Sequence, residues 1–373
     1  MIVEVSGGIM NIGIPKERRP FEFRVGLSPA GVAILTQKGH PVYVEHEAGV
    51  GAGFNDLEYE QAGARIVYSS DEVFGRADFL LKVARPTKEE IEWLRPGTTV
   101  AGLLHLASTQ RDKIDLLLEK KITSVAYEQI QLADHSLPVL RPFSEIGGSM
   151  CATIAARFLQ NNRGGKGILL GGVPSVPPAE VVILGSGVVA TYATRAFLGL
   201  GAHVTVIGID LAGLQKLHER FPGIVTMISS ERNIEKATAF ADVVVGAVLV
   251  TGQRAPILVT RKMVQNMKPR SVIIDVSIDQ GGCFETSRPT THELPVYAEE
   301  GVTHYCVPNM PSVVARTATH AFVNAAMPYI VQIADKGVEA AASADPSLEK
   351  AINTHQGQLM HLKIFEEAAN GLD

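Results

Sequence analysis

The chain has 373 residues, a length typical of about two domains. Hydrophobic residues make up 46% of it and charged residues 20%, which is the composition of a folded globular protein. Its 39 acidic residues outnumber its 34 Lys and Arg residues, so the net charge of -5 argues against a nucleic-acid-binding surface. Cys151, Cys283 and Cys306 are widely spaced and form no CxxC pair, which argues against a zinc site or a disulfide framework. We therefore expect no metal ligands.

The sequence also predicts a cytoplasmic protein. The densest apolar run, residues 243–250, is too short to span a bilayer. Residues 1–10 lack the basic start and apolar stretch of a signal peptide. We therefore expect neither a membrane nor a nucleic-acid partner. Met10 offers a second candidate start, and we interpret the first nine residues as an extension without a role in the fold.

Short apolar segments alternate with amphipathic ones in the first third of the chain. The apolar segments predict strands at residues 12–14, 42–44, 79–83, 99–102 and 123–126. A helix is predicted to begin at Ser28 and Pro29, with the serine as N-cap and the proline in the first turn. Further helices are predicted over residues 87–94 and 109–120. This alternation indicates a parallel sheet with helices on its faces.

A second cycle of the same kind follows a helix predicted over residues 145–161. Residues 171–178 are rich in Gly and Pro and predict a turn or hairpin. Helical patterns recur from residue 311 to residue 330 and beyond, and no third sheet is predicted there, so we expect these helices to pack on the first domain. The fold class predicted is α/β, with two Rossmann-like, doubly wound domains and a cleft between them. The strands expected in the second cycle are residues 181–184, 204–207, 243–245 and 272–275.

A glycine-rich loop stands at the start of the second cycle. Residues 185–190 read Gly-Ser-Gly-Val-Val-Ala, the pattern G-x-G-x-x-A between a predicted strand and a predicted helix. Gly185 permits a tight turn, Gly187 lets the backbone approach a pyrophosphate, and Ala190 is small enough for close packing of helix on strand. The N-terminus of the helix offers N–H groups and a partial positive charge to phosphates. The motif predicts dinucleotide binding, and the alternative is a glycine-rich turn in a buried layer.

The next strand ends without the usual ribose-binding acid. An acid at that position normally binds the ribose 2′-hydroxyl of NAD. Here the strand ends at Gly208, and Asp210 follows two residues later. Asp210 either reaches the ribose or caps the helix predicted from residue 211. No arginine directly follows the strand to bind a 2′-phosphate, so the pattern favours NAD without deciding between NAD and NADP.

Four ionisable residues stand at positions where ligands bind in open α/β sheets. Arg24 precedes the first predicted helix, and Lys82 ends an apolar strand. His105 directly follows a strand, and Asp279 lies in the loop after the strand at residues 272–275. Each has an ordinary alternative as a rim charge, a partly buried histidine or a turn residue. Together they offer two cations for a carboxylate and a carbonyl, and an acid–base histidine, which suits oxidation of a small amino or hydroxy acid.

Motifs from residue 11 to about residue 369 resemble the family of NAD-dependent L-alanine dehydrogenases, relatives of the NAD-binding subunit of proton-translocating transhydrogenase. In the first half the segments are residues 13–17 (GIPKE), 22–25 (EFRV), 81–83 (LKV), 104–107 (LHLA), 126–128 (AYE) and 142–145 (PFSE). In the second half they are residues 169–174 (LLGGVP), 246–250 (GAVLV), 278–285 (IDQGGCFE) and 304–311 (HYCVPNMP). Family members carry an acid at Gly208, often a lysine at Gly213 and usually a methionine at Phe143. The first two departures put the choice between NAD and NADP in doubt.

The resemblance implies that L-alanine, NAD and water give pyruvate, NADH and ammonium in a homo-oligomer, a hexamer. It implies that Arg24 and Lys82 bind the substrate carboxylate and carbonyl oxygen, that His105 is the general acid and base, and that Asp279 orients ammonia or water. The cofactor-lining positions that it implies are Ser144, Gly185, Gly187, Ser229, Val248, Leu249, Asn309 and Met310, to which the residue pattern adds Asp210.

We expect residues 10–138 and 311–373 to form a discontinuous substrate domain and residues 139–310 to form the NAD-binding domain. Three alternatives stay open at this point. The first is a transhydrogenase-type subunit that binds the cofactor without an amino-acid pocket. The second is a related amino-acid or opine dehydrogenase with a longer substrate, and the third is a non-catalytic NAD(H)-binding homologue.

Overall fold

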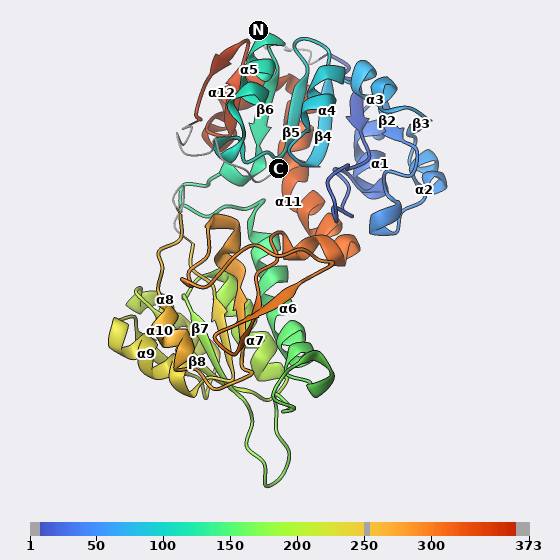
Figure 1. Cartoon of the computed structure of the whole chain (residues 1–373). Helices are drawn as coiled ribbons and strands as arrows, with labels where there is room; N and C mark the ends of the chain where they lie inside the picture. The colour runs from blue at the N-terminus through green and yellow to red at the C-terminus, as the bar shows by residue number, and fades with distance from the viewer. Residues whose placement is uncertain (1–7, 250–253, 363–373) are drawn as a thin grey trace. The chain divides into compact units, whose positions relative to one another are not determined.

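The computed structural model describes residues 8–249 and 254–362. The first seven residues of the expected extension, Val250 of the matching segments and the expected domain end at residues 363–373 lie outside the described residues. The chain divides into unit 1, Met1–Phe143 with Ser312–Asp373, and unit 2, Ser144–Pro311 (Figure 1). The α/β class with two domains is confirmed.

Unit 1 is built on an eight-stranded sheet with the order β15-β14-β6-β5-β4-β1-β2-β3. Strands β1 to β6 pair in parallel, whereas β14 pairs antiparallel with β6 and with β15. The last two strands extend this sheet, in a part of the chain where the sequence predicted only helices. The bounds are β1 (Ile12–Ile14), β2 (Val42–Glu45), β3 (Arg65–Val67), β4 (Phe79–Ala84), β5 (Thr99–Leu103), β6 (Thr123–Ala126), β14 (Ile352–His355) and β15 (Gln358–Leu359).

Helices cover the faces of this sheet. Phe74, Ile91 and Leu117, from α3, α4 and α5, pack with Leu80 and Val100 in one apolar cluster. Helices α1 and α11 contact each other, so the late helix packs within unit 1 as expected. The helices are α1 (Pro29–Gln37), α2 (Asp56–Gln61), α3 (Ser70–Arg76), α4 (Lys88–Trp93), α5 (Arg111–Glu119), α11 (Ala315–Lys336), α12 (Val338–Ala344) and α13 (Pro346–Glu349), with short turns η1 (Val50–Ala52), η2 (Leu106–Ser108) and η3 (Tyr127–Gln129).

Unit 2 is built on a seven-stranded sheet with the order β12-β13-β11-β10-β7-β8-β9. All neighbours pair in parallel except β12 and β13. From β9 through β7 to β13 the sequence of strands is the 3-2-1-4-5-6 order of a doubly wound fold. The bounds are β7 (Glu180–Leu184), β8 (His203–Gly208), β9 (Val225–Ile228), β10 (Val243–Gly246), β11 (Val272–Asp275), β12 (Val296–Glu299) and β13 (Val302–Tyr305).

Both faces of this sheet are buried, which explains its continuous apolar strands. Val181 and Ile183 of β7 pack in one cluster with α6, α7 and α8. Val182 and Leu184 pack in a second cluster with α9 and α10. The helices are α6 (Arg141–Phe158), α7 (Val188–Gly199), α8 (Leu211–Arg220), α9 (Glu231–Phe240) and α10 (Arg261–Gln265), with short turns η4 (Asn161–Arg163), η5 (Val276–Gln280) and η6 (Met310–Val314).

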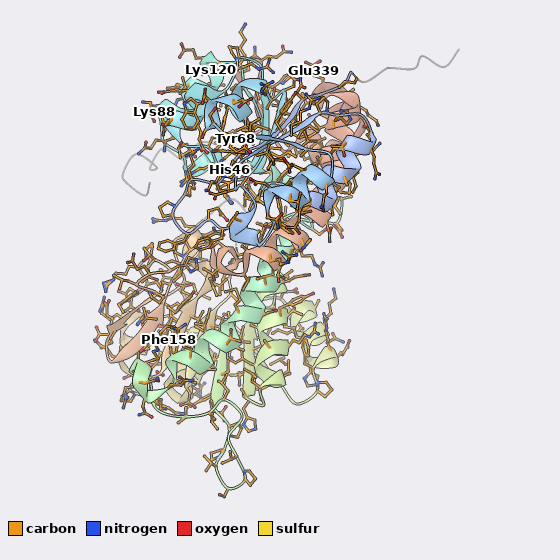
Figure 2. All side chains as sticks on the ribbon, turned by 90° about the vertical axis from the view of Figure 1, so that its right-hand side faces the viewer. His46, Tyr68, Lys88, Lys120, Phe158 and Glu339 are labelled. Atoms are coloured by element: carbon orange, nitrogen blue, oxygen red, sulfur yellow. The ribbon has the colours of Figure 1, made fainter. Side chains whose placement is uncertain are left out.

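Helix α6 begins one turn before the residue that its sequence pattern predicted. Gly148 lets it approach α7 closely, since a Cβ there would lie 2.4 Å from the carbonyl oxygen of Val189. Near the end of α6 lies Phe158, which Figure 2 labels. Its ring lies 6.1 Å from the ring of Tyr305 of β13, measured between centroids. These contacts attach α6 firmly to the sheet of unit 2.

The glycine- and proline-rich segment at residues 171–178 forms the predicted hairpin. Val173 and Val176 exchange backbone hydrogen bonds of 3.1 and 2.8 Å. Both side chains are exposed, and the loop projects from the rest of unit 2 (Figure 1). Within the described residues, no helix has the length and apolar character needed to cross a membrane.

Candidate active site

Four polar residues lie in the second half of, or after, neighbouring strands of unit 1, at one edge of its sheet. Glu17 comes after β1, Lys82 lies in the second half of β4, His105 follows β5, and Glu128 follows β6 in η3. The strands β6, β5, β4 and β1 are adjacent and parallel, so their carboxyl ends share this edge. The structure therefore brings Lys82 and His105 to the same edge, and Arg24 lies in the segment that connects β1 to α1.

Lys82 is fully buried between two carboxylates. Its Nζ lies 2.8 Å from Oε1 of Glu90 and 3.1 Å from Oε2 of Glu17. Burial opposes the charged form of Lys82, but the two carboxylates outweigh it, so the pKa of Lys82 is raised above its ordinary value. The ammonium group is therefore held charged inside the fold, with two of its three donors occupied.

The two carboxylates are themselves fixed by backbone groups. Glu90 is the third residue of α4, and its Oε2 accepts a 2.7 Å hydrogen bond from the backbone N–H of Thr87 in a capping box. Glu17 Oε1 accepts a 2.6 Å hydrogen bond from the backbone N–H of Val83. Burial raises the pKa of Glu17, and this effect exceeds the opposing attraction of Lys82.

Arg24 forms a second buried ion pair, with Glu22, which stands two residues before it in the sequence. Its Nε and Nη2 donate hydrogen bonds of 2.7 and 2.5 Å to the two carboxylate oxygens of Glu22. The guanidinium lies over the ring of Phe143, 4.8 Å from its centroid, and this ring contacts Phe322 of α11. Phe143 thus provides a flat aromatic surface for the cation.

His105 is held by its backbone while its side chain stays exposed. Glu128 accepts hydrogen bonds from the backbone N–H groups of Leu104, at 3.1 Å, and His105, at 2.6 Å. These bonds fix His105 in the left-handed region, at φ 42°, where few residues with side chains are found. Its Nδ1 lies 3.8 Å from Oε1 of Glu128, and its side chain is 55% exposed. The imidazole is therefore accessible to a ligand, and the Glu128 carboxylate lies near its Nδ1.

Sequence reasoning missed the buried carboxylates that organise this edge. Glu22 stands two residues before Arg24 in a predicted loop, and this spacing does not indicate an ion pair. Glu90 carried a signal, because Thr87 and Glu90 form the Thr-x-x-Glu capping pattern, but that pattern does not reveal a second partner. Glu17 and Glu128 both follow predicted strands, as His105 does, so their positions alone could have indicated them.

In the glycine loop of unit 2, the two glycines of the motif have different roles, one in folding and one in leaving room for a ligand. Gly185 has φ 120°, and a Cβ there would lie 2.3 Å from the carbonyl oxygen of Ala247. Gly187 is the N-cap residue of α7, and a Cβ there would meet no atom within 4 Å. The fold thus requires glycine at position 185, whereas at position 187 glycine leaves open space at a helix N-terminus. Such a space fits an anionic ligand.

Asp279 lies in a loop that a buried acid shapes. The carboxylate of Asp275, at the end of β11, accepts hydrogen bonds from the backbone of Ser277 and Cys283, each 3.0 Å long. Burial raises the pKa of Asp275, against the effect of these hydrogen bonds. Asp279 is exposed, and its Oδ1 accepts a 3.2 Å hydrogen bond from the backbone N–H of Asn309. The structure thus joins two residues expected at the site.

The remaining predicted residues of unit 2 mostly follow the carboxyl ends of its parallel strands. Val248 and Leu249 come after β10, and the backbone N–H of Val248 donates a 2.9 Å hydrogen bond to Ser277 Oγ. Ser229 follows β9, and its N–H donates to the carbonyl of Gly208. Ser144 is half-buried in α6, and Met310 is buried at the start of η6.

Asp210 has the capping role that was one of its two interpretations. Its Oδ1 and Oδ2 accept hydrogen bonds of 3.0 Å each from the backbone N–H groups of Ala212 and Gly213 at the start of α8. An approach of Asp210 to a ribose stays a prediction.

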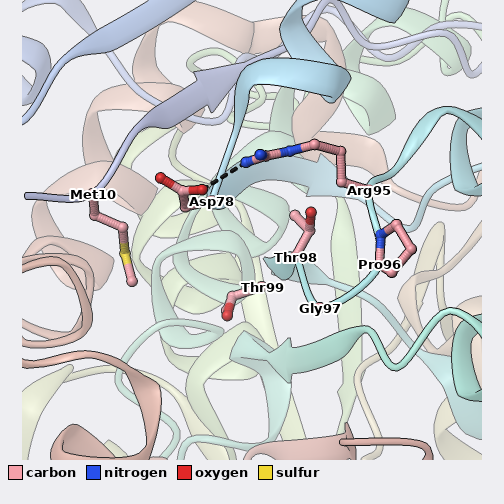
Figure 3. Close-up of a pocket in the computed structure, with 7 residues that line it drawn as sticks. All are labelled: Met10, Asp78, Arg95, Pro96, Gly97, Thr98 and Thr99. Atoms are coloured by element: carbon pink, nitrogen blue, oxygen red, sulfur yellow. Dashed lines mark hydrogen bonds and ion pairs between the residues drawn. The ribbon is translucent and has the colours of Figure 1, made fainter.

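A separate cavity lies away from these residues. It has a volume of about 230 Å³ and includes Thr98 and Thr99 at the start of β5 (Figure 3). Arg95 and Asp78 form an ion pair of 2.6 Å beside it. These residues mark the amino ends of β4 and β5, opposite the edge that carries Lys82. Among the residues that the structure describes, no group of three or more His, Cys, Asp or Glu side chains could hold a metal ion.

Comparison with known proteins identifies the family. The model of the alanine dehydrogenase/PNT N-terminal domain matches residues 13–147, and that of the C-terminal domain matches residues 151–362. The chain belongs to the alanine dehydrogenase/PNT family. It is 45% identical over 365 residues to an alanine dehydrogenase of Mycolicibacterium smegmatis, covering 98% of this chain and 97% of that protein.

Two solved structures show the same fold. A solved L-alanine dehydrogenase superposes with a TM-score of 0.91 at 44% identity, covering 94% of this chain and 97% of that one. A transhydrogenase from Sinorhizobium meliloti superposes with a TM-score of 0.81 at 26% identity, covering 94% of this chain and 99% of that one. Family membership therefore extends over both units.

Proposed function

We propose that the chain catalyses the reversible oxidative deamination of L-alanine to pyruvate and ammonium, with hydride transfer to NAD. The observation that carries this proposal is the carboxyl edge of unit 1, which presents Arg24, Lys82 and His105 together with their fixed carboxylate partners. A cofactor-binding subunit without an amino-acid pocket has no need of two buried cations and an exposed histidine at this edge. The near full-length similarity to alanine dehydrogenases supports the same conclusion.

The two cations bind the substrate in this proposal. Glu22 occupies Nε and Nη2 of Arg24, which leaves Nη1 for the substrate carboxylate. Glu17 and Glu90 occupy two donors of Lys82, which leaves the third for the oxygen of the carbonyl group. Fixed donors of this kind need no rearrangement when the substrate binds, so they contribute to catalysis by orientation.

Proton transfer falls to His105, with Asp279 as the orienting group. The imidazole takes a proton from the water that attacks the imine and returns it to the departing ammonia of the carbinolamine. Asp279 accepts hydrogen bonds from this water or ammonia. Overall, L-alanine, NAD and water give pyruvate, NADH, ammonium and one proton, so both hydrogens lost from the substrate are accounted for.

The glycine loop fits a dinucleotide cofactor. Gly187 leaves space free at the N-terminus of α7, where backbone N–H groups bind the pyrophosphate. Ser144, Ser229, Val248, Leu249, Asn309 and Met310 line the cofactor in this proposal. When bound, NAD accepts the hydride from the substrate Cα, and the chain provides its binding and orientation.

The experiment that tests the proposal is an assay of the purified full-length chain. NADH is incubated with pyruvate and ammonium, and its absorbance is followed across neutral and alkaline pH. The absorbance should fall only when both substrates are present. Consumption with longer 2-oxo acids but not with pyruvate would instead identify a dehydrogenase of a longer amino acid.

Assembly and location are the remaining parts of the proposal. We propose a homo-oligomer, a hexamer as in the resembling family, and the hairpin at residues 171–178 offers exposed apolar side chains for such contacts. The three cysteines of the chain are buried thiols, which suits the reducing cytoplasm that we propose as the location of the protein.

A further inference from the structure

The end of strand β8 lacks the group that normally selects NAD. In dinucleotide-binding folds a carboxylate at this position accepts hydrogen bonds from the ribose 2′-hydroxyl, and its charge repels the 2′-phosphate of NADP. Here β8 ends at Gly208, whose carbonyl accepts a 2.8 Å hydrogen bond from Ser229. Glycine provides neither the hydrogen bond nor the repulsion.

The nearest acid along the chain is engaged elsewhere. Both carboxylate oxygens of Asp210 accept backbone hydrogen bonds at the N-terminus of α8. These bonds orient the carboxylate toward the helix and spread part of its charge over two N–H groups. Asp210 is therefore a helix cap first, and its remaining negative charge is the repulsion that a 2′-phosphate would meet here.

A cavity with two cations opens beside this position. It has a volume of about 160 Å³ and is lined by Ser186, Thr191, Gly213, Lys216, Leu217 and Arg220. Lys216 and Arg220 lie four residues apart and so face the same side of α8. Within residues 8–249 and 254–362 neither has a carboxylate partner, and the guanidinium of Arg220 lies 5.4 Å from the centroid of the Phe221 ring.

Ser186 links this cavity to the strand end. Its Oγ would lie 2.9 Å from a Cβ at position 208 and 3.0 Å from a Cβ at position 213. Because residues 208 and 213 have no side chains, the Ser186 hydroxyl occupies the space beside them. This space lies next to the end of β8, where dinucleotide-binding folds place the ribose. Two unpaired cations and a hydroxyl group beside that strand end are the chemistry that binds a phosphate dianion.

We propose that this cavity is a 2′-phosphate subsite, so that the chain binds NADP(H) as well as NAD(H). The inference rests on the dinucleotide site proposed above and is independent of the amino-acid substrate. The two positive charges of Lys216 and Arg220 outweigh the single negative charge of Asp210. In the usual arrangement, by contrast, a carboxylate at the strand end repels the 2′-phosphate.

The subsite is tested by calorimetric titration of the full-length chain with two adenosine fragments, 2′,5′-ADP and 5′-AMP. The wild-type chain should bind 2′,5′-ADP at least as tightly as 5′-AMP. The double variant Lys216→Ala/Arg220→Ala should bind 2′,5′-ADP about tenfold more weakly and 5′-AMP nearly unchanged, as expected for the loss of two exposed charge pairs. The matched control is Lys236→Ala on α9, an exposed lysine on the other face of the sheet, which should change neither.

Gly208→Asp provides a second and opposite variant. It should weaken 2′,5′-ADP about tenfold or more relative to 5′-AMP, because it restores the repelling carboxylate. Wild-type binding of 5′-AMP tighter than that of 2′,5′-ADP would overturn the proposal, and so would a ratio that the double variant leaves unchanged.

Turnover separates this inference from the proposed function. If pyruvate and ammonium consume no NADH while 2′,5′-ADP binds as expected, the proposed activity fails and the subsite stands. If they consume NADH but 2′,5′-ADP does not bind, the subsite fails and the activity stands.

Discussion

Lys82 illustrates how single residues determine the chemistry of the candidate site. A lysine with 1% exposure loses nearly all of its hydration, and this loss favours the neutral form. Glu17 and Glu90 reverse that preference from two separate elements, the segment after β1 and the first turn of α4. Removing one partner from a buried pair leaves a charge uncompensated, so each of these carboxylates should be needed for substrate binding.

Glu90→Gln tests this arrangement while keeping the helix start, since glutamine also serves in a capping box. The KM for pyruvate should rise, and the free energy of unfolding should fall by about 1–3 kcal/mol because a buried charged hydrogen bond is lost. The raised pKa of Lys82 means that the stability from its charge is present below the ordinary value of 10.5 and is lost as the pH rises through the folded pKa. In the variant this loss should begin at a lower pH.

The matched control is Glu89→Gln, the exposed neighbour on the same helix turn. It should change neither the KM for pyruvate nor the pH dependence of denaturant unfolding. An unchanged KM and pH profile in Glu90→Gln would show that Lys82 does not depend on this carboxylate.

His105 carries the proton-transfer part of the proposal. His105→Ala should lower kcat by about 10²–10⁴-fold, the usual contribution of a positioned acid or base. Binding of NADH, followed by its fluorescence, should be unaffected, because His105 belongs to the sheet edge of unit 1. His203→Ala, which changes an exposed histidine at the amino end of β8, should keep full activity. Retained turnover in His105→Ala would assign His105 a structural role only.

At the scale of elements, each sheet places its candidate residues at the carboxyl ends of parallel strands. In unit 1 these are β1, β4, β5 and β6. In unit 2 they are β9, β8, β7, β10, β11 and β13, in the order of the sheet. The loop between β7 and α7 shows how an element separates folding from binding. Gly185 is required by close contact with the segment after β10, whereas nothing in the fold itself requires glycine at position 187.

Gly187→Ala and Gly185→Ala should therefore have different effects. Gly187→Ala should fold with equal or slightly higher stability, by up to about 1 kcal/mol, because alanine restricts the unfolded chain. It should nevertheless weaken NADH at least tenfold, since the methyl group occupies space meant for the pyrophosphate. Gly185→Ala should lower the melting temperature, because its Cβ would lie 2.3 Å from a carbonyl oxygen. NADH affinity unchanged in Gly187→Ala would exclude the loop as the pyrophosphate site.

At the scale of the whole molecule, the sequence predicted the architecture better than the site. Hydrophobic periodicity located the strands whose faces are buried, such as β7, β10 and β11. It missed the strands β3, β9, β12, β13, β14 and β15. Val225–Ile228 of β9, for example, lies at a sheet edge with half-exposed side chains, and Ile352–His355 of β14 contains two buried polar residues, Asn353 and Thr354. The periodicity signal depends on burial by apolar residues, so edge strands and polar strands escape it.

The candidate site was predictable where a residue type is unusual for its position. Lys82 within an apolar strand and His105 directly after one are such cases. The carboxylates that hold them were not, because Glu22 and Glu90 acquire their role only through partners that the folded chain brings near. The same holds for Asp210, whose capping bonds to Ala212 and Gly213 form only in the folded chain, while its approach to a ribose stays a prediction.

The hairpin at residues 171–178 should matter for assembly rather than for folding. Val173 and Val176 are 53% and 55% exposed, so replacing both by serine removes apolar contact surface without opening the core. We expect Val173→Ser/Val176→Ser to sediment as a smaller species with unchanged secondary structure. Val225→Ser, a change of similar exposure on β9, is the control. An unchanged sedimentation coefficient in the double variant would place the subunit contacts elsewhere.

The central claim, alanine dehydrogenase activity, is tested most directly by NADH consumption in the presence of pyruvate and ammonium. The purified chain should consume NADH only when both are supplied, and L-alanine should form in equal amount. In the reverse direction, L-alanine and NAD should yield NADH. No loss of NADH absorbance at any neutral or alkaline pH, in a preparation that binds NADH, would contradict the account.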